Sequence, residues 1–79
     1  MKPIKEILNK IKWDKNLNPD DFMIYYYDRV KKDFNEAKFS DILEVYENFA
    51  ELKTKSGKIN LPLHRIRQIS YKGEVYWKR

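Results

Sequence analysis

The stretch LPLHRIRQISYKGEVYWKR, residues 61–79, decides the predicted fold because it reads as a β-hairpin. Residues 63–71 fit an extended strand, Lys72 and Gly73 fit a two-residue turn, and residues 74–78 fit a returning strand. If Tyr71 faces Glu74, side chains alternate between two faces, and a shift of one residue would exchange them. The expected faces are Arg65, Arg67, Ile69, Tyr71, Glu74, Tyr76 and Lys78 on one side and His64, Ile66, Val75 and Trp77 on the other.

The arginine-bearing face of this hairpin mixes guanidinium, ammonium and phenol groups, as sheet surfaces that bind RNA do. His64, the one histidine of the chain, lies beside two of the four arginines. The net charge of +5 is concentrated in residues 53–79, which hold eight lysines or arginines against one glutamate. A basic surface of this kind attracts polyanions, although lysine-rich surfaces also occur on proteins that bind none.

The remaining chain predicts two helices and two further strands. An apolar stripe with helical spacing follows Pro3 and predicts a helix over residues 3–12. Residues 22–28 alternate as a central strand, with Phe22, Ile24 and Tyr26 on one face. Residues 33–38 predict a weaker strand. From residue 41, after an N-cap at Ser40, a second helix is expected, and a polar loop over residues 53–60 follows it. The apolar stripe of that second helix would be Ile42, Leu43, Tyr46, Phe49 and Ala50.

These elements predict a small single α+β domain over residues 1–79. Its antiparallel sheet would have three to four strands, including the C-terminal hairpin, with two helices packed on one side. The chain has no cysteine, which excludes thiolate metal sites, and we expect neither a metal nor a cofactor. It has no apolar run long enough to span a membrane, so we expect a cytoplasmic protein with no membrane partner. The oligomeric state stays open.

The sequence offers little for an enzyme. Cleavage of a phosphodiester without metal takes a general acid and a general base, and a single histidine supplies one of them. The second group would have to be Asp28, a tyrosine or a lysine. Asp28 could instead orient a guanidinium for phosphate binding, or it could form an ordinary ion pair at a strand end. His64 could equally be a structural histidine that bonds to the backbone after Pro62.

Three pieces of the chain carry a resemblance to a known family. They are ILNKIKWD near the start, DDFMIYYYDR, which contains Tyr26, Asp28 and Arg29, and the stretch over residues 61–79. Together they resemble the RNA cyclic group end recognition domain, a small and chiefly archaeal family. The family usually ends in Trp-Asp-Arg, whereas this chain has Trp77-Lys78-Arg79, so an acidic role at that position is absent.

The resemblance implies a domain that recognises processed RNA 3′ ends, above all 2′,3′-cyclic phosphate termini, alone or beside RNA-processing enzymes. On this hypothesis arginines contact phosphate, His64 donates to the terminal group, Asp28 orients an arginine, and Tyr26 or Tyr76 stacks on a base. The arginines concerned are Arg29, Arg65 and Arg67. Two alternatives remain: a metal-independent cyclic phosphodiesterase that uses His64, and a protein-interaction module that uses the acidic second helix and binds no RNA.

Overall fold

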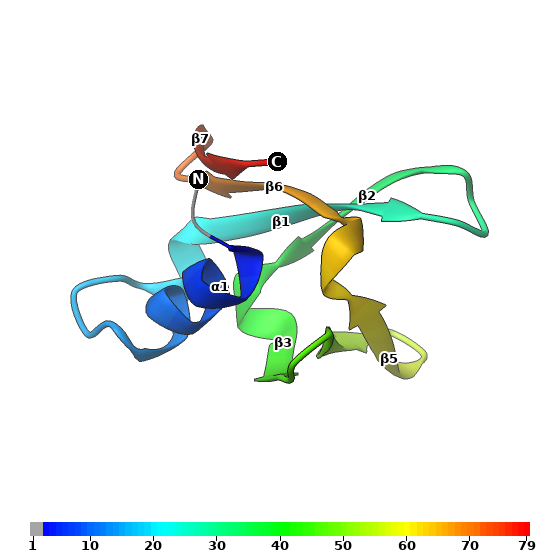
Figure 1. The fold of residues 1–79 in the computed structure, drawn as a ribbon, viewed down its shortest axis with the longest axis horizontal. Helices are drawn as coiled ribbons and strands as arrows, with labels where there is room; N and C mark the ends of the chain where they lie inside the picture. The colour runs from blue at the N-terminus through cyan, green and yellow to red at the C-terminus, as the bar shows by residue number, and fades with distance from the viewer. Residues whose placement is uncertain (1–2) are drawn as a thin grey trace.

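The computed structural model describes residues 3–79, which form one α-helix and two antiparallel sheets (Figure 1). Sheet A has four strands in the order β2-β1-β6-β7, and sheet B has three in the order β3-β4-β5. Figure 1 shows α1 and sheet B on the same side of sheet A. The elements are α1 (Ile4–Trp13), β1 (Phe22–Asp28), β2 (Asp33–Lys38), β3 (Ile42–Val45), β4 (Phe49–Thr54), β5 (Gly57–Pro62), β6 (Ile66–Tyr71) and β7 (Glu74–Lys78), with short 3-10 helices η1 (Pro19–Asp21), η2 (Phe39–Asp41) and η3 (Leu63–Arg65).

One hydrophobic core joins α1 to both sheets. The predicted apolar stripe of α1 is buried, and it packs in the same cluster as the inner side chains of β1 and of sheet B. This confirms the predicted first helix. The predicted strand over residues 33–38 is also confirmed, since these residues form β2. The largest fully buried side chains are Leu8, Ile11, Phe22, Ile24, Leu52, Ile66 and Ile69.

β1 is a central strand, as its sequence predicts. It pairs with β2 on one side and with β6 on the other. Phe22, Ile24 and Tyr26 are buried, while the alternate residues Met23 and Tyr25 are half-exposed on the outer face of sheet A. This period of two is the expected pattern for a strand with one face on the core.

The predicted second helix is wrong. The chain from residue 42 forms β3, turns through residues 46–48 and returns as β4. Ile42 pairs with Leu52, and Ala50 pairs with Leu61, so the buried apolar residues of this region meet across strands and not along a helix. The expected polar loop over residues 53–60 likewise reduces to a tight turn between β4 and β5. Sheet B thus covers the core where the second helix was expected.

The C-terminal hairpin is confirmed, and so is its turn. Tyr71 pairs with Glu74, and Lys72 and Gly73 have φ of 50° and 86°. Positive φ at both central positions is the geometry of a type I′ turn, which suits the right-handed twist of a two-residue hairpin.

The predicted faces of this hairpin are wrong because the strand begins late and two bulges interrupt the alternation. The segment over residues 63–65 forms η3, and β6 begins at Ile66. Tyr25 pairs with Gln68 and Tyr26 with Ile66, so Arg67 is an extra residue on β6. As a result Ile66 and Ile69 both point to the core while Arg67 is exposed.

The second bulge lies between β6 and β7. Ile69 pairs with Trp77 and Ser70 with Val75, which leaves Tyr76 as the extra residue of β7. The ring of Tyr76 packs 5.1 Å from that of Phe22, centroid to centroid, and is therefore directed to the inner side of sheet A.

Candidate functional site

The 3-10 helix η3 positions His64. Pro62 precedes it with φ of −60°, and Leu63 is buried and donates its backbone N–H to the carbonyl oxygen of Asn48 at 3.0 Å. The turn is thereby tied to the β3–β4 hairpin. The next two side chains face outward, with His64 exposed and Arg65 half-buried. The side chain of His64 therefore does not belong to the hydrophobic core.

Arg79 holds η3 from the other side. Its Nε donates to the carbonyl oxygen of Ile66 at 3.1 Å, and its Nη2 donates to that of Leu63 at 3.2 Å. Its guanidinium carbon also lies 5.4 Å from the centre of the Trp77 ring. A guanidinium has five N–H donors, so three remain beyond the two carbonyl bonds. Arg79 is thus a pre-oriented cation beside the turn that carries His64.

His64 and Arg79 line one open pocket of about 370 Å³. Lys5, from the first turn of α1, lines it as well and forms an ion pair with Glu47. The Lys5 ammonium donates a hydrogen bond to the Glu47 carboxylate and holds the pKa of that carboxyl below its ordinary value. The pocket, called here the His64 pocket, is lined by Pro3, Ile4, Lys5, Glu47, Asn48, Leu63, His64 and Arg79.

Arg67 lies outside the His64 pocket. It lines a neighbouring pocket of about 360 Å³ on the outer face of sheet A, together with Tyr25, Phe34, Gln68 and Lys78. Arg79 lines both pockets, so the two are adjacent.

Asp28 is the last residue of β1, and Arg29 is the first residue of the turn to β2. The Asp28 carboxylate accepts hydrogen bonds from the backbone N–H groups of Val30 and Lys31 at 3.0 and 3.2 Å, and from the side-chain amide of Asn35 at 2.9 Å. These bonds shape the turn, and Arg29 is exposed on it.

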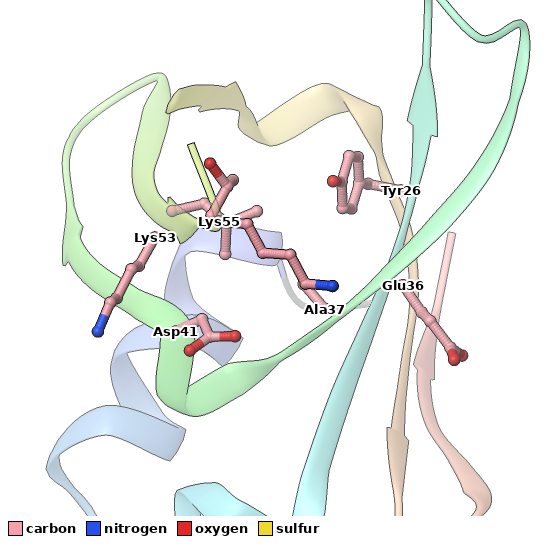
Figure 2. A pocket seen from close by; sticks show the side chains of 8 residues that line it. Tyr26, Glu36, Ala37, Asp41, Lys53 and Lys55 are labelled. Carbon is pink, nitrogen blue, oxygen red and sulfur yellow. The ribbon is translucent and has the colours of Figure 1, made fainter. Parts of the chain in front are cut away.

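Tyr26 and Tyr76 are both directed inward. Tyr26 is 9% exposed and lines a pocket of about 390 Å³ between the sheets. Figure 2 shows its ring pointing from β1 into this pocket, with Asp41 and Lys53 across from it. Neither ring therefore offers a free face comparable to an exposed aromatic side chain.

The acidic side chains expected on the second helix lie on the β3–β4 hairpin, and lysines of α1 engage two of them. Lys5 pairs with Glu47, and Lys12 pairs with Glu44 at 3.2 Å. Within residues 3–79 no group of three or more histidine, cysteine, aspartate or glutamate side chains is placed to hold a metal ion. No helix in the same range is long and apolar enough to cross a membrane.

The structure therefore divides the predicted residues. His64 joins Arg79 and Lys5 in one pocket, Arg67 belongs to the next pocket, and Arg29 lies on a separate turn. Sequence reasoning did not single out Arg79 or Lys5 as candidates. The Trp-x-Arg ending was the available signal for Arg79, whereas no local pattern marks a lysine of the first helix as a neighbour of His64.

Comparison with known proteins gives one family. The chain matches the MJ1316 RNA cyclic group end recognition domain over residues 1–79. Three UPF0248 proteins of Saccharolobus islandicus, from strains M.14.25, M.16.27 and L.S.2.15, are each 33% identical to it over 79 residues. Each alignment covers 96% of this chain and 98% of the relative. No solved structure matches the chain significantly.

Proposed function

This chain belongs to the MJ1316 RNA cyclic group end recognition domain family, and on that premise we propose that it binds processed RNA 3′ ends carrying a 2′,3′-cyclic phosphate. The observation that carries the proposal is the pre-oriented guanidinium of Arg79 beside the exposed His64 in one pocket. A cyclic phosphate is a compact monoanion at a strand end. It suits an arginine that offers two N–H groups and a histidine that donates one hydrogen bond.

In this proposal three residues of the His64 pocket have separate tasks. Arg79 binds the phosphate oxygens, His64 donates to the terminal group, and Lys5 adds positive charge. Arg65, half-buried beside His64 and outside the lining of both pockets, supplies a further phosphate contact. Arg67 takes the phosphate next to the terminal one, since its pocket adjoins the first through Arg79.

Arg29 contributes at longer range. The turn that carries it is shaped by the Asp28 carboxylate, so the proposed part of Asp28 is to present Arg29 to the RNA backbone. Asp28 would thus orient an arginine through the backbone of the turn and not by direct contact with the guanidinium.

Equilibrium binding of matched oligonucleotides tests the proposal. They would end in a cyclic phosphate, a 3′-phosphate or a 3′-hydroxyl and be otherwise identical. We expect the cyclic end to bind tightest and Arg79→Ala to weaken binding of that end. Lys58→Ala, on exposed β5 of sheet B, is the matched loss of one positive charge outside both pockets. Equal affinity for the three ends would contradict end recognition and leave general RNA binding.

A second candidate function is opening of the cyclic phosphate. It is favoured by the presence of Lys5 and His64 in the same pocket, since two groups that transfer protons are the minimum for acid–base hydrolysis. Water would attack phosphorus, one of the two ester P–O bonds would break, and the freed ribose oxygen would take a proton. Incubation of a cyclic oligonucleotide with excess protein for hours, followed by separation of the products, tests this. Absence of any monophosphate product excludes it.

A further inference from the structure

The outer face of sheet A carries aromatic rings beside positive charges. Tyr25, Gln68 and Lys78 form one row across β1, β6 and β7, because Tyr25 pairs with Gln68 and Gln68 pairs with Lys78. On β2, which borders β1 on its other side, Phe34 packs edge-on against Tyr27 of β1, with ring centroids 5.7 Å apart. These side chains share one face because β1 alternates and its inner residues are buried.

Phe34 is an exposed aromatic ring of this face, with 56% of it accessible. It does not close the core, and its pocket neighbours are mostly polar or charged: Tyr25, Arg67, Gln68, Lys78 and Arg79. The exposed ring lies beside three cations, Arg67, Lys78 and Arg79, which line the same pocket. The same combination suits single-stranded nucleic acid, where bases stack on rings and phosphates follow the positive charges. Glu36, opposite Tyr25 on β2, places a carboxylate on this face.

We propose that this face, called here the stacking face, binds the nucleotides that lie 5′ to the recognised RNA end. Bases stack on Phe34 and Tyr25, and Arg67 and Lys78 bind the phosphates between them. Arg79 lines both this pocket and the His64 pocket, so a strand whose terminal phosphate lies at His64 continues directly onto the stacking face. The inference rests on the proposed function for the position of the 3′ end, and it adds the substrate class: an unpaired 3′ overhang of several nucleotides.

The first arm of the test varies length at a fixed end. Oligonucleotides of one to six nucleotides with the same cyclic terminus are titrated against the wild-type domain and against Phe34→Ala. Wild-type affinity should rise with length over the first few nucleotides. In Phe34→Ala the affinity for the hexanucleotide should fall about fivefold or more, the low end of what loss of one stacked base costs, with little change for the mononucleotide. Unchanged hexanucleotide affinity would overturn the proposal.

Three variants serve as controls. Trp13→Ala removes an aromatic ring that is 73% exposed but lies on α1, and it should leave the length dependence intact. Phe34→Trp keeps a ring for stacking and should retain the long-oligonucleotide affinity. Phe34→Leu keeps apolar contact with Tyr27 without a π-face and should behave as Phe34→Ala does. If Phe34→Leu behaves as wild type, the ring does not stack on a base and the proposal fails.

The second arm varies the end at a fixed length of six nucleotides. It tests the proposed function alone, so the two ideas can fail separately. Length dependence without end preference would keep the stacking face and remove end recognition. End preference without length dependence would keep end recognition and remove the stacking face. A hexanucleotide paired to a complement up to its last residue should lose the length-dependent gain, because paired bases cannot stack on Phe34. An equal gain for paired and unpaired strands would overturn the proposal.

Discussion

The guanidinium of Arg79 donates a hydrogen bond to the carbonyl oxygen of Leu63 at 3.2 Å, and so fastens the end of the C-terminal hairpin to the turn that carries His64. A second bond, to the carbonyl of Ile66, fixes the plane of the guanidinium. One side chain therefore has two functions: it supports the turn, and it lines both pockets.

Arg79→Ala should lower stability and RNA affinity together. The loss of two hydrogen bonds from a charged donor at a partly exposed position should reduce the free energy of unfolding by about 1–3 kcal/mol, measured by urea denaturation. Arg79→Lys keeps the charge but not the fork of donors, so it should recover only part of both quantities. A lysine variant indistinguishable from wild type would show that charge alone matters.

His64→Ala should leave the fold intact, because the side chain is exposed on η3. Its free energy of unfolding should stay within about 0.5 kcal/mol of wild type. Discrimination between cyclic and hydroxyl ends should fall by about 1.5–3 kcal/mol, the worth of one charge-assisted hydrogen bond, with a nearly unchanged salt dependence. If the domain unfolds on this change, His64 supports the structure despite its exposure.

Glu47→Gln should strengthen RNA binding. The carboxylate occupies the ammonium of Lys5 at the His64 pocket and repels an incoming phosphate. Its removal should raise affinity roughly twofold to fivefold at low salt, and the gain should shrink as salt is added. Glu44→Gln is the matched control, since Glu44 pairs with Lys12 on the same helix and does not line this pocket. An equal gain in both variants would indicate net charge, not the pocket, as the cause.

The Lys5–Glu47 pair should weaken in acid. The pKa of the Glu47 carboxyl is lowered by the hydrogen bond from Lys5 and by the charge of its ammonium. A carboxyl with a lowered pKa in the folded state stabilises the fold above its ordinary pKa, and that contribution is lost as pH falls through the lowered value. An NMR pH titration should place the Glu47 midpoint below the ordinary glutamate value, and Lys5→Ala should return it there. A midpoint that Lys5→Ala leaves unmoved would contradict this pairing in solution.

Lys72→Asn should stabilise the hairpin. Lys72 has φ of 50°, a conformation that asparagine adopts more readily than lysine. The change also removes the contact of the Lys72 ammonium with the Tyr71 ring at 5.3 Å, so the net gain should be about 0.5 kcal/mol by thermal or urea unfolding. Lys58→Asn, at a strand position of β5 without positive φ, should not stabilise. A gain of equal size there would assign the effect to loss of charge.

Local patterns predicted the elements whose signals agree with one another. The helix over residues 3–12 combines an apolar stripe with an N-terminal proline, β1 alternates without interruption, and Lys72-Gly73 marks its own turn. The stripe from Ile42 to Ala50 fits a helix and a hairpin equally well. Its outcome is decided by two residues outside the stripe: Leu52 pairs with Ile42, and Leu61 pairs with Ala50.

The candidate site was also predictable only in part, because residue type is visible in the sequence and long-range pairing is not. His64 and the arginines stand out by residue type and by their closeness in the sequence. Their separation into two pockets depends on the bulge at Arg67, for which the sequence has no glycine or other local marker. Arg79 acts through backbone carbonyl oxygens, which every residue has, so its partners could not be read from side-chain identity.

The pairing of β1 with β6 has a consequence for how fast this domain forms. Every other strand pair joins neighbours along the chain, whereas β1 and β6 are separated by the whole of β2 and sheet B. Bringing them together closes the longest loop between any two paired strands of the described chain, and the entropy of that closure is lost before the contacts compensate for it. We therefore expect closure of this pair to limit the refolding rate. Ile69→Val in β6 should slow refolding, while Leu52→Val in β4 should mainly accelerate unfolding, as stopped-flow kinetics would show. The reverse assignment would place sheet B, and not this long-range pair, in the folding nucleus.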